Sequence, residues 1–262
     1  MDISLKGKRA LVGGSTSGIG KAIAMRLANC GASLTLMARN EEKLKQVLAE
    51  LNTSEGQEHG YLVTDFYNFE AHRANLTEFF KQAAVDILVN NSQGPKAGDV
   101  FSKSEQDYQE AFDLLFQNAV HASMLAIPYM QQEGFGRIIN VSSMTVKEPV
   151  SSLLLSNTMR TALVSWSKSL SVATAPKGIT VNTVLTGSFD TDRLHSLMLM
   201  QAEQLGKSVA EVKANKLATI PMGRLGDPNE YGDLVAFLAS EQAAFLTGAA
   251  IPLDGGASVG LF

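Results

Sequence analysis

The chain has 262 residues, of which 45% are hydrophobic, and this is enough to bury the core of one α/β domain of ordinary length. Its formal net charge is −4 and its basic residues are scattered, which argues against a cationic face for nucleic acid or for an anionic membrane. We therefore expect a single domain over residues 1–262 with no nucleic-acid partner and no membrane partner.

The sequence contains neither a recognisable leader nor a membrane span. Residues 1–6 lack the apolar core of a signal peptide, and no run approaches the roughly 20 apolar residues that a membrane helix needs. The single cysteine, Cys30, cannot form an intrachain disulfide, and its place near the end of a predicted helix favours a packing role. We expect a soluble, cytoplasmic protein that acts on small molecules.

The first predicted elements are a strand, a glycine-rich turn and a helix. Residues 10–12 are a short apolar run suited to a buried strand, and the residues up to Asn29 carry apolar side chains at helical spacing. Glycine reaches backbone angles that a Cβ penalises, and a helix N-terminus offers unpaired N–H groups to an anion. The pattern predicts a nucleotide-phosphate loop, with a ligand-free turn as the alternative; its residues are Gly14, Ser15, Thr16, Ser17, Gly18, Ile19 and Gly20.

A second strand is predicted over 33–38, with Asn40 as the N-cap of a helix that runs to Leu51. In dinucleotide-binding folds an acidic residue at the end of this strand holds ribose hydroxyls, whereas an arginine accommodates a 2′-phosphate. Ala38 and Arg39 stand there, so the sequence favours NADP(H) over NAD(H). The alternative is a solvated arginine at a strand end.

Two further strands are predicted over 60–64 and 85–89, with a helix over 69–82 between them. In an open parallel sheet, ligands bind at the carboxyl ends of the strands. The side chains that follow the second of these strands are therefore candidate ligand contacts: Asn90, Asn91, Ser92, Gln93 and Gly94.

A long helix is predicted from Ser104 through Gln131, with Asn118 inside it. A polar residue in the middle of a helix is as consistent with a solvated surface as with a functional position. We interpret His121 as a surface histidine or one with its hydrogen bonds satisfied, because no other residues at metal-ligand spacing accompany it, and we expect no metal site.

The last part of the chain continues the alternation of strands and helices. Residues 190–217 are apolar and helical, a pattern that by itself fits an ordinary amphipathic helix pair. Asp227 as N-cap, Pro228 and Glu230 predict the start of a helix that runs to Ser240. The other elements are a strand over 137–141 before Ser142 and Ser143, a helix over 152–174, a strand over 178–184 before Thr186 and Gly187, and a final strand over 245–252.

This alternation along the whole chain predicts an α/β fold: one doubly wound, Rossmann-type parallel sheet with helices on both faces.

Several of these motifs together resemble the classical short-chain dehydrogenases/reductases over essentially the whole chain. The glycine spacing is G-x-x-x-G-x-G, residues 90–94 are similar to the family's Asn-Asn-Ala-Gly with a glutamine inserted, and residues 140–143 match Asn-x-Ser-Ser. The stretch 221–228 and the closing residues 253–256 are similar to those of the β-ketoacyl carrier-protein reductases.

The resemblance implies roles for individual residues. Asn118 falls at the family's active-site asparagine, and Ser143 at the serine that hydrogen-bonds the substrate oxygen. It also implies a homodimer or homotetramer through the helices at 104–131 and 152–174, and a substrate lid at 190–217. The cofactor contacts that it implies, with those from the pattern above, are Gly14, Ser15, Thr16, Ser17, Gly18, Ile19, Gly20, Arg39, Asp65, Phe66, Asn90, Asn91, Ser92, Gly94, Arg160, Thr186 and Gly187.

The resemblance fails at the family's catalytic Tyr-x-x-x-Lys, where this chain has Ser156 and Arg160. In the family, a lysine cation lowers the pKa of the tyrosine phenol from about 10 towards neutrality, and the phenol gives its proton to the substrate oxygen. An aliphatic hydroxyl is far less acidic, and an arginine keeps its proton. Tyr108 and Tyr129 are tyrosines that could approach from elsewhere in the fold.

Three interpretations follow from this departure. The first is an NADP(H)-dependent oxidoreductase acting on a carbonyl, possibly a 3-oxoacyl group, or on a conjugated substrate. In it, Ser143 and Ser156 bind the oxygen, Arg160 stabilises charge and water near Asn118 brings the proton. The second is an NADP(H)-binding sensor or structural protein without turnover, and the third is a module whose nucleotide site has decayed. The sequence leaves the substrate open.

Overall fold

The computed structural model describes residues 3–260, and seven of its strands form one sheet in the order β3-β2-β1-β4-β5-β6-β7. Every neighbouring pair is parallel, as the predicted α/β class requires. The strands are β1 (Arg9–Gly13), β2 (Ser33–Ala38), β3 (Gly60–Val63), β4 (Ile87–Asn90), β5 (Gly136–Val141), β6 (Ile179–Thr186) and β7 (Ala250–Leu253).

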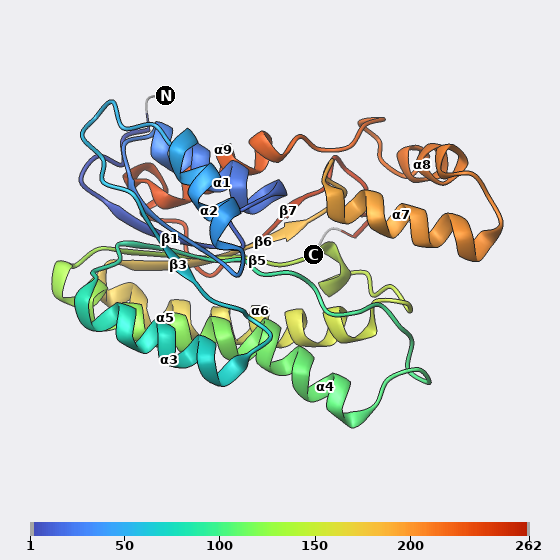
Figure 1. The fold of residues 1–262 in the computed structure, drawn as a ribbon, viewed down its shortest axis with the longest axis horizontal. Helices are drawn as coiled ribbons and strands as arrows, with labels where there is room; N and C mark the ends of the chain where they lie inside the picture. The colour runs from blue at the N-terminus through green and yellow to red at the C-terminus, as the bar shows by residue number, and fades with distance from the viewer. Residues whose placement is uncertain (1–2, 261–262) are drawn as a thin grey trace.

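Helices cover both faces of this sheet (Figure 1). One face carries α1 (Gly18–Asn29), α2 (Glu41–Glu50) and α9 (Pro228–Ala239), and the other carries α3 (Phe69–Gln82), α4 (Glu105–Phe112), α5 (Asn118–Glu133) and α6 (Leu154–Thr174). Two further helices, α7 (Asp192–Leu205) and α8 (Val209–Ala218), follow β6 and extend beyond the sheet. Short helical turns are η1 (Asp113–Gln117), η2 (Met144–Val146), η3 (Ala175–Lys177) and η4 (Glu241–Ala243).

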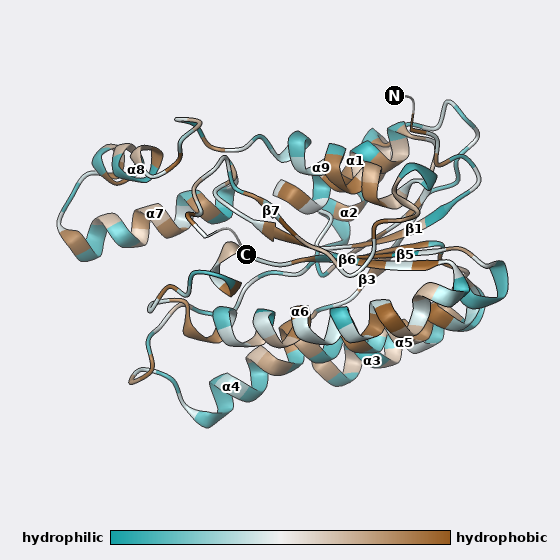
Figure 2. Cartoon of the chain, turned by 180° about the vertical axis from the view of Figure 1, so that it is seen from behind, coloured by the Kyte–Doolittle hydropathy of each residue, from teal (hydrophilic) through white to brown (hydrophobic). Residues whose placement is uncertain are grey.

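The strands divide the apolar core into two layers. Successive side chains of a strand point to opposite faces of a sheet. In β1, Ala10 and Val12 therefore join the cluster under α1 and α9, while Leu11 joins the cluster against α5 and α6. Figure 2 shows the strands as a hydrophobic centre between helices whose outer sides are hydrophilic. Burying each large apolar side chain stabilises the fold by about 1.5–3 kcal/mol, so both layers hold the strand ends in place.

The predicted elements are confirmed at most positions. The strand over 33–38 and the helix over 69–82 have the expected bounds, and Asn40, Ser104 and Asp227 cap helices as expected. Residues 190–217 form a helix pair, separated where Gly206 takes a left-handed conformation with φ 62°. No helix within residues 3–260 is long and apolar enough to cross a membrane.

Several boundaries are shifted by one or two residues, and two elements differ from the sequence predictions by more than that. The expected helix over 104–131 is interrupted by a π-helical turn, η1, so that the α-helical pattern ends at Phe112 and resumes at Asn118. The expected strand over 245–252 begins only at Ala250, because η4 and a turn at Gly248 precede it. Phe245, an apolar residue that suggested a strand, is fully exposed.

Candidate active site

The turn after β1 is packed so closely that side chains are excluded from it. A Cβ on Gly20 would lie 2.1 Å from the Gly14 carbonyl oxygen, and a Cβ on Gly14 would lie 2.8 Å from Asn91 Nδ2. Ser17 precedes α1 without a side-chain cap, so the first N–H groups of α1 keep no side-chain partner. This open helix end beside bare backbone suits a phosphate group.

Other residues of the loop hold it in place. Ser15 is buried, and its hydroxyl oxygen accepts a hydrogen bond of 3.0 Å from the Met37 amide in β2. Ile19 packs against the core, Thr16 is half-buried and Ser17 is exposed. Ser15 and Ile19 therefore fix the loop to the protein, and the backbone of the remaining loop residues faces outward.

Arg39 follows β2 and is exposed beside this loop. It forms no ion pair with any of the residues 3–260, in which ten ion pairs are present. An exposed guanidinium without a carboxylate partner at this strand end fits the 2′-phosphate of NADP(H).

The ends of β3 and β4 are tied together across the cleft. Asp65 accepts a bond from the amide of Tyr67, and the Tyr67 hydroxyl donates to the Gly94 carbonyl over 3.4 Å. Phe66 is buried against the ring of His72. Asp65 thus shapes the turn, and its half-buried carboxylate lies at the edge of the cleft.

The two asparagines after β4 bind protein groups. Asn90 donates to the Asn140 side chain over 2.8 Å and to the Ser123 hydroxyl over 3.1 Å, which joins β4 to β5 and α5. Asn91 donates to the Gly13 carbonyl over 2.9 Å. Ser92 donates only to the neighbouring Gln93 carbonyl. The side-chain amide nitrogens of both asparagines therefore hold the strand ends together. Both residues also line the pocket described next.

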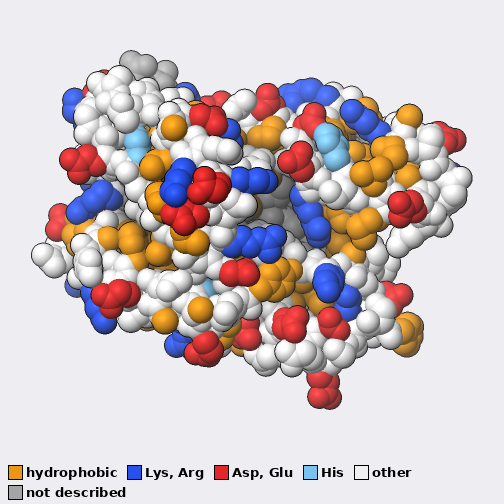
Figure 3. All heavy atoms as spheres, viewed as in Figure 1, with side chains coloured by type: hydrophobic (Ala, Val, Ile, Leu, Met, Phe, Trp, Pro, Cys, Tyr) orange, Lys and Arg blue, Asp and Glu red, His pale blue; other side chains and the backbone are white. Residues whose placement is uncertain are grey.

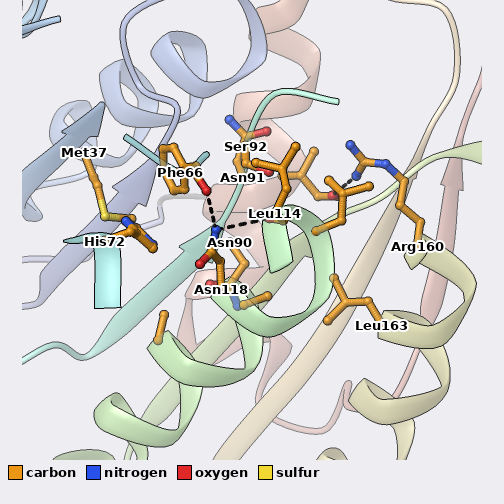
Figure 4. A pocket seen from close by; sticks show the side chains of 14 residues that line it. Met37, Phe66, His72, Asn90, Asn91, Ser92, Leu114, Asn118, Arg160 and Leu163 are labelled. Atoms are coloured by element: carbon orange, nitrogen blue, oxygen red, sulfur yellow. Dashed lines mark hydrogen bonds between the residues drawn. The ribbon is translucent and has the colours of Figure 1, made fainter. Parts of the chain in front are cut away.

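A small pocket lies below these strand ends, between the sheet and the helices α5 and α6 (Figure 4). It brings together many of the predicted site residues from separate segments. The side chains that line it are Met37, Phe66, His72, Asn90, Asn91, Ser92, Leu114, Leu115, Asn118, Ala119, Ala122, Val141, Arg160 and Leu163.

Asn118 stands where η1 gives way to α5 and is 4% exposed. Its Nδ2 donates to the Phe66 carbonyl over 2.9 Å and, more weakly, to the Leu114 carbonyl over 3.5 Å, as Figure 4 shows. Its Oδ1 has no partner among the described residues. A buried acceptor without a partner is costly, so this oxygen is a place for a water or another donor.

Ser143 follows β5 closely, and Arg160 bonds both Ser156 and the last residue of β5, Val141. The Ser143 hydroxyl oxygen accepts from the amide and the hydroxyl of Thr145, over 3.2 and 3.1 Å. Arg160 donates from Nε to the Ser156 hydroxyl oxygen over 3.1 Å and from Nη1 to the Val141 carbonyl over 2.7 Å. Burial lowers the pKa of Arg160 to about 10, partly opposed by Tyr231 and reinforced by Arg193, so the guanidinium stays charged at neutral pH.

Thr186 and Gly187 close the opposite side of the cleft. The Thr186 hydroxyl lies 3.0 Å from the hydroxyl of Tyr231, a buried residue of α9 whose pKa is raised by burial. A Cβ on Gly187 would lie 2.5 Å from Asp254 Cα, so this bend requires glycine. His195 pairs with Asp190 over 2.8 Å and does not line the pocket.

The suggestion that Tyr129 approaches the site is wrong. Arg9, the first residue of β1, donates to its hydroxyl, so Tyr129 lies at the amino ends of the strands while the pocket lies at their carboxyl ends. Tyr108 packs against the core cluster on the α5 side and does not line the pocket. Within residues 3–260, no group of three His, Cys, Asp or Glu residues is arranged to hold a metal ion.

The structure also reveals residues that the sequence patterns did not single out. Tyr67 and Arg193 lie at the cleft, and His72 lines the pocket. The sequence offered one indication of Arg193. A cation in the first turn of a helix opposes the helix dipole, so its presence there suggests a role outside the helix.

Comparison with known proteins agrees with this geometry. A family model described as "Enoyl-(Acyl carrier protein) reductase" matches residues 14–258. The chain belongs to the short-chain dehydrogenase/reductase family. It is 33% identical over 254 residues to the NADPH-dependent reductase BacG of Bacillus subtilis, covering 95% of this chain and 97% of the relative. It is 30% identical over 257 residues to the 3-oxoacyl-[acyl-carrier-protein] reductase FabG of Aquifex aeolicus, covering 98% and 99% of the two chains.

Solved structures of the family share the whole fold. YwfH, described as an NADPH-dependent reductase involved in bacilysin biosynthesis, superposes with a TM-score of 0.90 at 31% identity over 97% of this chain and 99% of its own. The L-sorbose reductase of Gluconobacter frateurii, solved with NADPH and L-sorbose, gives a TM-score of 0.92 at 27% identity over 100% of both chains.

We predict that Gly18→Ala weakens NADPH binding by tenfold or more, on the order of 1.4 kcal/mol. Gly18 has φ +50°, and a Cβ there would lie 3.2 Å from Thr191 Cγ2, inside the phosphate cradle. Fluorescence titration with NADPH measures the effect. Gly134→Ala is the matched control, because Gly134 has φ +62° with no atom within 4 Å of its Cβ position. Equal affinities of the two variants would contradict the assignment of the cradle.

We predict a pH dependence of stability from His72, which is 1% exposed. Burial, with a smaller contribution from His121, lowers its pKa from 6.5 to about 4. Between these values the unfolded state binds more protons than the folded state, so the free energy of unfolding falls as the pH falls. The loss is complete below pH 4 and amounts to roughly 3 kcal/mol.

Urea unfolding of wild type and His72→Gln from neutral pH to about pH 4 measures this effect. The variant is expected to lose less stability in acid than the wild type, while His195→Gln, which changes an exposed histidine, behaves like the wild type. Parallel stability curves for wild type and His72→Gln would show that His72 does not titrate as described.

Proposed function

We propose that the protein is an NADPH-dependent oxidoreductase whose substrate is a carbonyl or conjugated compound, and that its catalytic site works without the family's tyrosine and lysine. The observation that carries the proposal is the Arg160 guanidinium, which lines the pocket and bonds both Ser156 and the end of β5, the strand that leads to Ser143. The NADPH-dependent reductases among its relatives support the cofactor and the reaction class.

The cleft offers groups for each part of the cofactor. The bare glycine loop and the open end of α1 suit the diphosphate, and Arg39 suits the 2′-phosphate. We assign Asp65 and Phe66 to the adenine side, and Asn91, Ser92, Gly94, Thr186, Gly187 and Arg160 to the nicotinamide side. When bound there, NADPH supplies the hydride.

The two serines suit the binding of a substrate oxygen. Each hydroxyl oxygen already accepts hydrogen bonds, Ser143 from Thr145 and Ser156 from the Arg160 guanidinium. Each serine therefore keeps its own O–H proton to donate, and the incoming hydrogen bonds polarise that proton. We propose that both hydroxyls donate to one substrate oxygen and stabilise the negative charge that develops there.

The proton requires a different source from the family's phenol. Arg160 stays protonated at neutral pH because its pKa is about 10, so it stabilises charge without donating its proton. We propose that a water held by Asn118 Oδ1, which has no partner among the described residues and belongs to a pocket that Arg160 also lines, carries the proton.

The further parts of the proposal concern the whole chain. We propose that residues 1–262 act as one dinucleotide-binding unit, that α7 and α8 form its lid, and that it works in the cytoplasm. Apolar side chains exposed on the outer helices, Met124 of α5 and Val172 of α6, support a homodimer or homotetramer through this face.

We predict that the wild type oxidises NADPH with a member of a panel of ketones, 3-oxoacyl esters and enones, and that Ser156→Ala lowers kcat about 100-fold. Ser165→Ala, on an exposed turn of the same helix, is the control and keeps full activity. An inactive wild type that gains ketone reduction through Ser156→Tyr with Arg160→Lys would instead identify a cofactor-binding protein without turnover.

We predict that light scattering gives the mass of a dimer or tetramer. Met124 and Val172 are 54% and 69% exposed, so changing both to glutamate places charge on the proposed interface and is expected to yield monomers. A monomeric wild type at micromolar concentration contradicts the proposed assembly.

A further inference from the structure

Arg193 links the lid to the loop after β4. It lies in the first turn of α7, and its Nη2 donates to the Pro95 carbonyl over 3.4 Å, 98 residues away in sequence. The same nitrogen is 3.8 Å from the position of a Cβ on Gly94. This exposed guanidinium therefore reaches across the cleft, held by one long hydrogen bond.

The charge of Arg193 is not balanced by a carboxylate. It forms no ion pair within residues 3–260, and the nearby Asp190 is paired with His195. A cation in the first turn also opposes the helix dipole. The position is thus unfavourable for α7 itself, and the protein gains no ion pair from it.

A second guanidinium lies on the neighbouring strand end. Arg160 lies above β5, and β5 pairs with β4 through Asn140 and Asn90. Its Nε and Nη1 bind Ser156 and Val141, which leaves Nη2 without a hydrogen bond among the described residues. Burial lowers the pKa of Arg160, and the like charge of Arg193 lowers it further. Figure 3 shows several Lys and Arg side chains near the middle of this face of the molecule.

We propose that Arg193 and Arg160 together bind an oxyanion, a carboxylate or a phosphate, over the carboxyl ends of β4 and β5. This inference rests on the proposed function and adds a substrate class to it. The oxyanion belongs either to the substrate or to the cofactor diphosphate. The Arg160–Ser156 bond favours the substrate. The cofactor is the alternative source, because Thr191, two residues before Arg193, lies beside Gly18 of the diphosphate cradle.

Such an anion offsets the charge of the two arginines, and it also holds the lid formed by α7 and α8 in place. It replaces the weak Pro95 acceptor with a charged one, and charge-assisted hydrogen bonds are about twice as strong as neutral ones. Arg193 then holds α7 over the pocket, and a carbonyl next to the bound carboxylate is directed towards the two serines. The substrate class is therefore a carbonyl or conjugated compound that carries an acidic group.

The test is a set of binding titrations on the full chain, which need no turnover. The proteins are wild type, Arg193→Gln, Arg193→Lys and the control Lys213→Gln, which removes one charge from an exposed position on α8. Three ligands are titrated: NADPH alone, inorganic pyrophosphate alone, and oxalate with the NADPH-saturated protein. Nicotinamide fluorescence and calorimetry report the affinities.

We expect Arg193→Gln to weaken oxalate binding tenfold or more and to leave the NADPH affinity unchanged. A loss of this size is on the order of what one or two charge-assisted hydrogen bonds contribute. Arg193→Lys recovers part of it, because it keeps the charge and loses the planar fork. Weakened NADPH and pyrophosphate binding also supports an oxyanion site and assigns the anion to the cofactor. The proposal is overturned if Arg193→Gln binds oxalate, NADPH and pyrophosphate as tightly as Lys213→Gln does. This outcome does not depend on whether the protein turns over a substrate.

Discussion

The cleft depends on the close backbone contact between the turn after β1 and the end of β4. Asn91 donates to the Gly13 carbonyl over 2.9 Å, and its amide nitrogen fills the space that a side chain on Gly14 or Gly20 would need. This contact draws the loop onto the sheet and leaves the N-terminus of α1 facing outward. Without it, the helix end and the strand ends would not border one site, because only glycine backbone approaches so closely.

The chemical character of the site comes from Arg160. In the family to which the chain belongs, the resembled motif places a lysine here, next to a phenol that can lose its proton. The guanidinium in this chain instead bonds the Val141 carbonyl and the Ser156 hydroxyl, so it orients a hydroxyl and keeps its charge. We propose that a site built in this way stabilises a developing negative charge by fixed donors and takes its proton from water. The orphaned oxygen of Asn118 fits that requirement.

Particular elements show where sequence patterns succeed. The caps at Asn40, Ser104 and Asp227 were predictable because each side chain binds an amide within three residues. The final strand was misplaced because Phe245 is apolar yet exposed, and hydrophobic spacing alone does not report burial. The helix over 104–131 was predicted without its π-helical turn, since the spacing of apolar residues scarcely changes when one residue is added to a turn.

The sequence by itself determined the alternation of strands and helices, the glycine loop and the preference for a phosphate-bearing cofactor, and it led us to expect Ser156 and Arg160 at the family's tyrosine and lysine positions. These features are local, because glycine angles, caps and periodicity act within a few residues. Only the tertiary structure decided that Asn118 donates to the Phe66 carbonyl, that Asn90 donates to Asn140 in β5, and that Arg193 donates to the Pro95 carbonyl. Such contacts join segments far apart in the chain, and they exist only once two packed layers have set the distances between strand ends and helices.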